Sequence, residues 1–119
     1  MPPALPIVFV VSRDWSLRTP LRAELREHGV EALGIETADD VGKALAQGIV
    51  PAVVVIDGAE LEQEPARQAI ANLAQQVAVL VVDSRLSPAP EIRGTERLLR
   101  PISVGDIARR VLTELGKSD

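Results

Sequence analysis

The stretch Ala52-Val53-Val54-Val55-Ile56-Asp57-Gly58 decides the fold of this chain. Its five consecutive apolar residues, most of them β-branched, indicate a strand that is buried on both faces, as in parallel sheets covered by helices. Asp57 closes the run. Open α/β sheets place their chemistry at the carboxyl ends of their strands, so this carboxylate is the first candidate for a functional residue.

Four further strands alternate with helical patterns along the chain. The expected strands share short runs of β-branched or leucine residues: Ile7 to Val11, Val30 to Glu36, Ala52 to Ile56, Val77 to Val82, and Leu98-Leu99. The expected helices carry apolar residues at helical spacing: Leu17, Leu21 and Leu25; Val41, Ala44 and Leu45; Ala69, Ile70 and Leu73; and Val104 to Leu115. Alternating strands and helices predict a parallel sheet with helices on both faces.

Local signals set some of the helix boundaries. Thr37 begins a sequence that resembles a capping box, so we expect it to cap the second helix. Pro20 lies inside the first helical pattern, which predicts either a kink there or a regular helix that starts at Pro20 with Thr19 as its cap. The segment from Asp83 to Arg100 is short and interrupted by prolines, so a helix between the last two strands should be short or missing.

Composition excludes several classes of function. The chain has 119 residues, which suits one domain over residues 1–119, and its net charge of −4 gives no basic surface for nucleic acid. It has no cysteine and a single histidine, so thiolate and multi-histidine metal sites are excluded. No apolar run is long enough to span a membrane, and the first six residues lack the positive charge of a secretory signal. We therefore expect a cytoplasmic protein with no membrane partner.

The carboxyl ends of the first, third, fourth and fifth expected strands should converge at one edge of the sheet. These ends carry most of the polar groups that could do chemistry: Ser12, Arg13, Asp14, Asp57, Asp83, Ser84 and Arg100.

With these residues, the chain from Ile7 to Leu115 resembles the receiver domain of two-component response regulators, the CheY-like family. The single aspartate that closes the third strand fits that family, and so does a basic residue followed by proline, Arg100-Pro101, after the fifth. The resemblance implies a flavodoxin-like strand order 2-1-3-4-5 and a role in signal transduction, in which a sensor kinase phosphorylates the position of Asp57 in a phosphorelay. It also implies Mg²⁺, held by an acidic pair after the first strand together with this aspartate.

Several residues depart from the family pattern. The acidic pair falls on Ser12 and Arg13, with Asp14 one place late; the hydroxyl position falls on Asp83, with Ser84 next to it. Arginine does not deprotonate, so Arg13 places a fixed cation where the metal would be bound. Arg100 stands at the lysine position, and the aromatic switch position falls near Arg97.

From these departures we predict that Arg13, Asp57, Asp83 and Arg100 neutralise one another in a permanent ion-pair network, because Asp83 would otherwise repel Asp57. The chain would then be an atypical receiver, or pseudo-receiver, and not an enzyme. It would use no cofactor and act through a protein partner or self-association.

Two alternatives stay open. The first is a phosphorylatable receiver with a remodelled site, in which Asp14 and Asp57 are the weak candidates for Mg²⁺ ligands. The second is a small-ligand or nucleotide-binding α/β domain with Arg13 and Arg100 as anion ligands. Trp15, next to the same strand end, is either a residue at the edge of the core or an exposed anchor for a partner.

Overall fold

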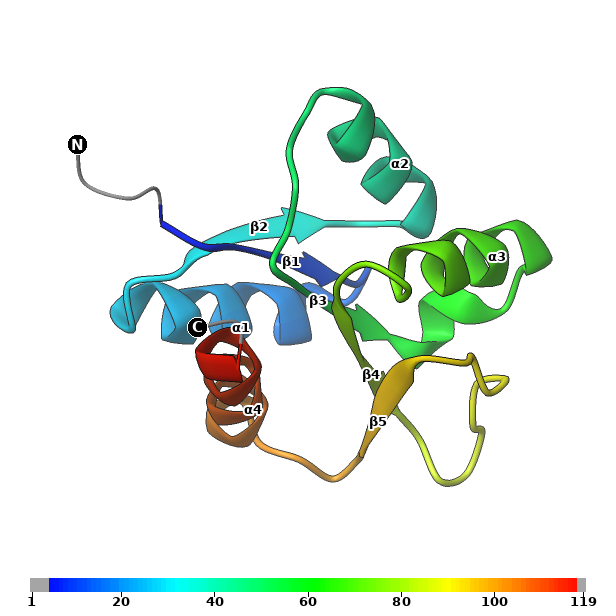
Figure 1. Cartoon of the computed structure of the whole chain (residues 1–119). Coiled ribbons are helices and arrows are strands. Elements are labelled where there is room, and N and C mark those ends of the chain that lie inside the picture. The colour runs from blue at the N-terminus through cyan, green and yellow to red at the C-terminus, as the bar shows by residue number, and fades with distance from the viewer. Residues whose placement is uncertain (1–4, 118–119) are drawn as a thin grey trace.

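A computed structural model of the chain describes residues 5–117 and shows a parallel sheet with helices on both faces (Figure 1). The strands are β1 (Ile7–Val11), β2 (Glu31–Ile35), β3 (Val53–Asp57), β4 (Ala78–Asp83) and β5 (Thr95–Leu99). The helices are α1 (Trp15–Glu27), α2 (Ala38–Ala46), α3 (Glu64–Leu73) and α4 (Val104–Lys117), together with the short 3₁₀ helix η1 (Gly58–Leu61).

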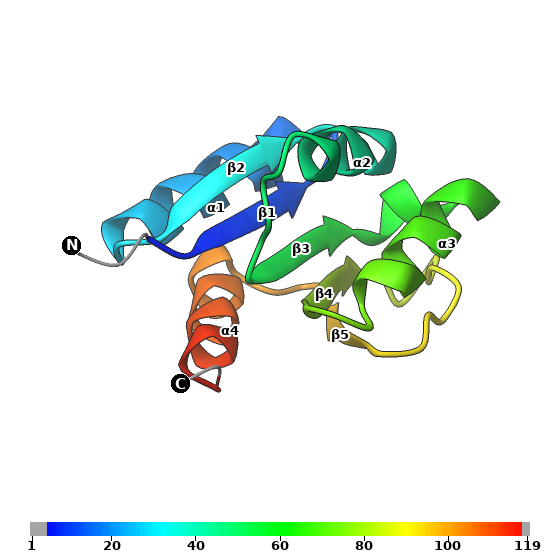
Figure 2. The same ribbon diagram turned by 45° about the horizontal axis from the view of Figure 1, so that its top comes forward.

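All paired strands run parallel, in the order β2-β1-β3-β4-β5. This confirms the predicted fold class and strand order. Because β3 occupies the centre, its carboxyl end lies between those of β1 and β4, and the loops that follow these strands gather at one edge of the sheet (Figure 2). We call this edge the carboxyl edge.

The central strands bury alternate residues on opposite faces, as their uninterrupted apolar runs predict. On one face Val53 and Val55 of β3 pack with the leucines of α1 and with Ile107 and Val111 of α4. On the other face, where α2 and α3 lie, Val54 and Ile56 belong to a second cluster. A core on both sides fixes the register of β3, because a slip of one residue would exchange the two sets of side chains.

The helix boundaries confirm some expectations and correct others. Thr37 caps α2, accepting a hydrogen bond from the N–H of Asp40. Thr19 is not a cap: α1 already begins at Trp15, Asp14 caps it, and Pro20 lies inside the helix. In α3 the buried residues are Ala66, Ile70 and Leu73, whereas Ala69, which was expected on the apolar side, is exposed.

No helix forms between β4 and β5, as the sequence predicted. Residues 84–94, which we call the strap, run as a loop beside the sheet, and Ile92 is buried there against the core cluster on the α3 side. β5 is longer than the expected Leu98-Leu99, beginning at Thr95.

Within residues 5–117, no helix combines the length and the apolar character needed to cross a membrane. Residues 1–4, which belong to the segment without a secretory pattern, lie outside the described part of the chain.

Candidate functional site

Asp57 lies at the carboxyl end of β3, in the middle of the carboxyl edge, and only 5% of its surface is exposed. Its Oδ1 accepts a hydrogen bond of 3.1 Å from the N–H of Ala59, which makes Asp57 the cap of η1. Its Oδ2 accepts the hydroxyl of Ser12 at 3.0 Å and lies 3.4 Å from Nη2 of Arg100. Both carboxylate oxygens are thus already bound by protein groups.

Ser12 is fully buried and holds Asp57 from the neighbouring strand. Its Oγ donates to Asp57 and accepts the N–H of Asp14 at 3.0 Å. Its carbonyl accepts Nη1 of Arg18 at 2.6 Å. These contacts fix one orientation of the hydroxyl, so Ser12 is a structural partner of Asp57.

The side chain of Asp14 caps the N-terminus of α1. Its Oδ1 accepts the N–H of Ser16 at 2.9 Å and the hydroxyl of Ser16 at 2.6 Å. These two hydrogen bonds, with smaller contributions from Arg100 and Arg18, hold the pKa of Asp14 below its usual value.

A pH titration tests this capping role. Because the folded-state pKa of Asp14 is lowered, its charged form stabilises the fold at pH values above the ordinary aspartate pKa, and that contribution is lost as the pH falls through the lowered value. An Asp14→Asn variant keeps an acceptor at the cap but does not titrate. We expect wild type to have the higher Tm at neutral pH and the difference to shrink in acid; a difference that grows below about pH 4 would contradict this role.

The sequence suggested that Arg13 pairs with the aspartates at the strand ends, but Arg13 pairs with Glu60 instead. Its Nε lies 3.3 Å from Oε1 of Glu60 in η1, and its main-chain N–H donates to Oε2 of the same residue. The Arg13 side chain is 73% exposed, whereas that of Glu60 is 6% exposed. The guanidinium therefore lies at the solvent-exposed surface of the carboxyl edge, where it pairs with a buried carboxylate.

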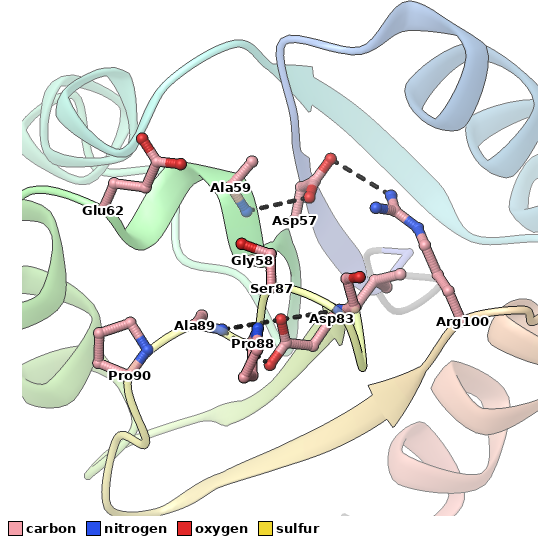
Figure 3. A pocket seen from close by; sticks show the side chains of 12 residues that line it. Asp57, Gly58, Ala59, Glu62, Asp83, Ser87, Pro88, Ala89, Pro90 and Arg100 are labelled. Atoms are coloured by element: carbon pink, nitrogen blue, oxygen red, sulfur yellow. Dashed lines mark hydrogen bonds and ion pairs between the residues drawn. The ribbon is translucent and has the colours of Figure 1, made fainter.

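Asp83 closes β4 and is only 2% exposed. Its carboxylate accepts the N–H groups of Ser84 and Ala89, at 2.8 and 3.0 Å, and forms a 3.1 Å ion pair with Nε of Arg97 from β5. Figure 3 shows the side chain turned toward Ala89 in the strap. Asp83 thus binds the strap and β5. Its partners differ from those of Asp57.

Gly58 separates these two carboxylates. A Cβ atom at this position would lie 2.8 Å from Oδ1 of Asp83 and 3.4 Å from Cβ of Ala89. A larger residue after Asp57 would therefore crowd the Asp83 carboxylate that reaches the strap.

The predicted single network of Arg13, Asp57, Asp83 and Arg100 is wrong in its pairing. Arg100 neutralises Asp57, Arg97 neutralises Asp83, and Arg13 pairs with Glu60. The predicted repulsion between the two aspartates is avoided, because each carboxylate has its own arginine and its own N–H donors. The edge carries separate fixed ion pairs in place of one shared network.

A cavity of about 220 Å³ lies between η1, the strap and Arg100 (Figure 3). Asp57, Asp83 and Ser84 line it, but most of their polar atoms are engaged: Oγ of Ser84, for example, accepts the N–H of Leu86. A neighbouring hollow of about 390 Å³ is lined by Arg13, Asp14, Asp57 and the η1 side.

The residues present do not fit the Mg²⁺ that the family resemblance implies. Mg²⁺ requires several oxygen ligands in near-octahedral arrangement. The oxygens of Asp57 are bound by Ser12, Ala59 and Arg100, and Asp14 is bound by Ser16. In the described part of the chain no group of three acidic, histidine or cysteine residues converges on a metal position.

Sequence reasoning missed three contributors to this site. Glu60 and Gly58 received no role from the sequence, and Arg97 was considered only near the position of the switch aromatic. Arg97 had a detectable signal, since β5 runs beside β4 and Arg97 lies two residues before its end. Trp15 is 68% exposed at the start of α1, which rules out a position at the edge of the core; that it anchors a partner stays a prediction.

No protein-family model matches the sequence, and no curated protein sequence matches it significantly. Solved structures do match its fold. The receiver domain of Francisella response regulator 1452 superposes with a TM-score of 0.77 at 17% identity, covering 96% of this chain and 99% of that one. The chemotaxis response regulator CheY4 of Vibrio cholerae gives 0.73 at 15% identity, covering 93% and 99%.

The same fold also occurs inside an enzyme. The lysine decarboxylase LdcF of Francisella novicida matches with a TM-score of 0.73 at 15% identity over 94% of this chain, but the match spans only 17% of that protein. At identities this low, the similarity establishes the fold only. The function has to be inferred from the residues of the site. The fold of this chain is therefore that of response-regulator receiver domains.

Proposed function

We propose that this chain is a receiver-like signalling domain that acts by binding proteins, without efficient transfer of a phosphoryl group to Asp57 and without enzymatic activity of its own. The observation that carries the proposal is the engagement of both Asp57 oxygens, by Ser12, Ala59 and Arg100. An in-line attack on a phosphodonor needs a free carboxylate oxygen and a cation that neutralises the incoming charge. Here the oxygens are bound and the expected metal ligands are a serine and an arginine.

A second feature supports a domain held in one state. At the position where the resemblance places a switch aromatic, Arg97 pairs with buried Asp83 and also donates to the carbonyl of Ala89. Breaking that pair would leave a buried carboxylate without its cation, which is costly. β5 and the strap are thus fixed to β4 by an interaction that does not depend on phosphate.

The surface suits protein association. Trp15 and Leu86, which are 68% and 98% exposed, both follow strand ends at the carboxyl edge. Tryptophan is a common anchor in protein interfaces, and Leu86 adds exposed apolar surface after a neighbouring strand end. The net charge of −4 argues against nucleic acid, and we place the domain in the cytoplasm with other proteins as its partners.

The small-ligand alternative has weaker support. Of the two hollows beside Asp57, the 220 Å³ cavity is smaller than most ligand pockets, which are about 300–1,000 Å³. The 390 Å³ hollow is within that range, but four carboxylates and a single arginine line it: Asp14, Asp57, Glu60, Glu62 and Arg13. Arg100 is paired with Asp57, and two buried carboxylates lie on the cavity wall, so an anion such as a nucleotide phosphate would meet net negative charge.

A phosphodonor assay tests the proposal. The purified chain is incubated with acetyl phosphate and Mg²⁺ and examined by intact-mass spectrometry, with Asp57→Asn as the matched control. We expect no acyl phosphate in either protein. Stoichiometric labelling of wild type that disappears in Asp57→Asn would overturn the proposal and establish the alternative of a remodelled but phosphorylatable receiver, which a sensor kinase could then serve.

A further inference from the structure

The sheet has two edge strands, β2 and β5. They differ in whether other parts of the chain cover the main-chain N–H and C=O groups that point away from the sheet. In β2, the N–H of Glu31 and the carbonyl of Ile35 form hydrogen bonds on the side of β1. Because successive residues of a strand alternate in direction, the N–H and C=O groups of Ala32 and Gly34 point away from β1, to the outside of the sheet. The carbonyl of Ala32 receives Nε of Arg22 at 3.1 Å. A Cβ at Gly34 would lie 3.0 Å from side-chain atoms of Arg18 and Arg22, so glycine makes room for these arginines. The β2 edge is therefore partly covered.

The β5 edge has no such cover. The N–H of Arg100 donates to the carbonyl of Asp83, and Asp83 lies opposite Leu99, so the main chain of Glu96, Leu98 and Arg100 faces β4. The N–H and C=O groups of Arg97 and Leu99 then face outward. Over residues 5–117, no hydrogen bond reaches them. Figure 2 shows β5 as the last strand on its side. An uncovered edge strand is a template for another strand.

The side chains of β5 favour a second copy of the same strand. In an antiparallel pair centred on Leu98, Arg97 and Leu99 exchange main-chain hydrogen bonds with Leu99 and Arg97 of the second copy. Glu96 then lies opposite Arg100 of that copy, twice by symmetry. Opposite charges directly across strands are stabilising. Both side chains are accessible, with Glu96 44% and Arg100 41% exposed. Within its own chain Glu96 pairs with Arg110 at 2.6 Å and Arg100 pairs with Asp57 at 3.4 Å, so in the dimer each charge would be shared between two partners. The neighbouring register centred on Arg97 places two arginines opposite each other and is disfavoured.

We propose that β5 pairs with β5 of a second copy in this antiparallel register, forming one continuous sheet across the dimer. The pairing deepens the proposed function and rests on it for its signalling role, because it names one of the protein partners. It also connects the interface to the candidate site. Arg100, which neutralises Asp57, is the same residue that meets Glu96 of the second copy.

A cysteine cross-link tests the register. The natural chain has no cysteine, so a Leu98→Cys variant carries one thiol. In the proposed pair the two thiols lie at a non-hydrogen-bonded position, where Cα atoms are about 4.5 Å apart, within disulfide range. We expect a covalent dimer under mild oxidation. The matched control is Ala69→Cys on the exposed side of α3, which should stay monomeric on a denaturing gel.

Two further variants test the association itself by sedimentation equilibrium. Leu99→Pro removes an outward N–H and no ladder bond, so it should keep the circular dichroism spectrum and lose the dimer. Glu96→Arg and Arg100→Glu should each be monomeric alone, because like charges then face each other across the two strands. When the two variants are mixed they should form a heterodimer, because positions 96 and 100 of the two copies again carry opposite charges. Arg100→Glu also removes the cation beside Asp57, and Glu96→Arg removes the partner of Arg110, so the circular dichroism spectrum of each variant is compared with wild type first. The Leu98→Cys cross-link breaks no ion pair and keeps the test valid if these variants fail to fold.

Three results would each refute the pairing: a wild-type monomer at high micromolar concentration, a Leu99→Pro dimer as strong as wild type, or equal cross-linking of the two cysteine variants. None of them bears on whether Asp57 accepts phosphate. The phosphodonor assay decides that question separately, so failure of the β5 pairing and failure of the proposed function are distinguishable.

Discussion

Replacing Asp83 with alanine is expected to lower the free energy of unfolding by about 2–4 kcal/mol, because the change leaves the N–H groups of Ser84 and Ala89 and the guanidinium of Arg97 without their shared acceptor. For a domain of 119 residues this corresponds to a fall in Tm of roughly 10 °C or more. Chemical denaturation measures the energy directly. Hydrogen exchange at the amide of Ala89 should accelerate, since this amide is held by Asp83 alone.

Two comparison variants show whether the effect comes from the strap. Asp83→Asn keeps one acceptor oxygen and should lose less stability than alanine. Gly58→Ala brings a Cβ within 2.8 Å of Oδ1 of Asp83 and should cost about 1–3 kcal/mol by crowding. In the Gly58→Ala/Asp83→Ala double variant the carboxylate that causes the clash is gone, so the two losses should be less than additive. Strict additivity would mean that the two residues act independently, against the geometry described here.

The fold was readable from the sequence because its strongest signals lie in the centre of the sheet. The runs that end in Asp57 and Asp83 are apolar on both faces, and only a covered parallel sheet buries both faces at once. Both aspartates continue their strands in the structure, so the expected ends were one residue short. β5 was underestimated because three of its five residues are exposed and two of them are charged, a pattern that an edge strand tolerates and a buried one does not.

The site was predictable in position but not in pairing. Strand order alone brings the ends of β1, β3, β4 and β5 together, so the candidate residues were correctly gathered at one edge. The partner of each charge depends on loop conformation. Asp83 turns to the strap because two amides converge there, and Arg13 turns to Glu60 because η1 places that carboxylate above the end of β1. The strap and η1 carry no periodic pattern from which their conformation could be predicted.

The second large effect is expected from rebuilding the acidic pair. In a Ser12→Asp/Arg13→Asp variant, the hydroxyl that donates to Asp57 is replaced by a buried carboxylate. Like charges about 4 Å apart repel by up to about 4 kcal/mol at an effective dielectric constant near 20, so the variant should be much less stable than wild type in the absence of metal. The matched control, Ser12→Asn/Arg13→Asn, changes the same positions without adding charge.

Addition of Mg²⁺ should then change the Tm of the aspartate variant and leave that of wild type unchanged. A divalent cation bound between Asp57 and the new carboxylates removes their repulsion and binds only the folded state, so it should raise the Tm of the aspartate variant, by an amount equivalent to about 2.7 kcal/mol when the metal is at 100 times its Kd. Wild type should not respond, because Ser12 and Arg100 occupy the oxygen that a metal needs. A Mg²⁺-dependent rise in wild type, lost in Asp57→Asn, would instead mean that these contacts yield to a cation, and the phosphorylatable alternative would then be the better account of the site.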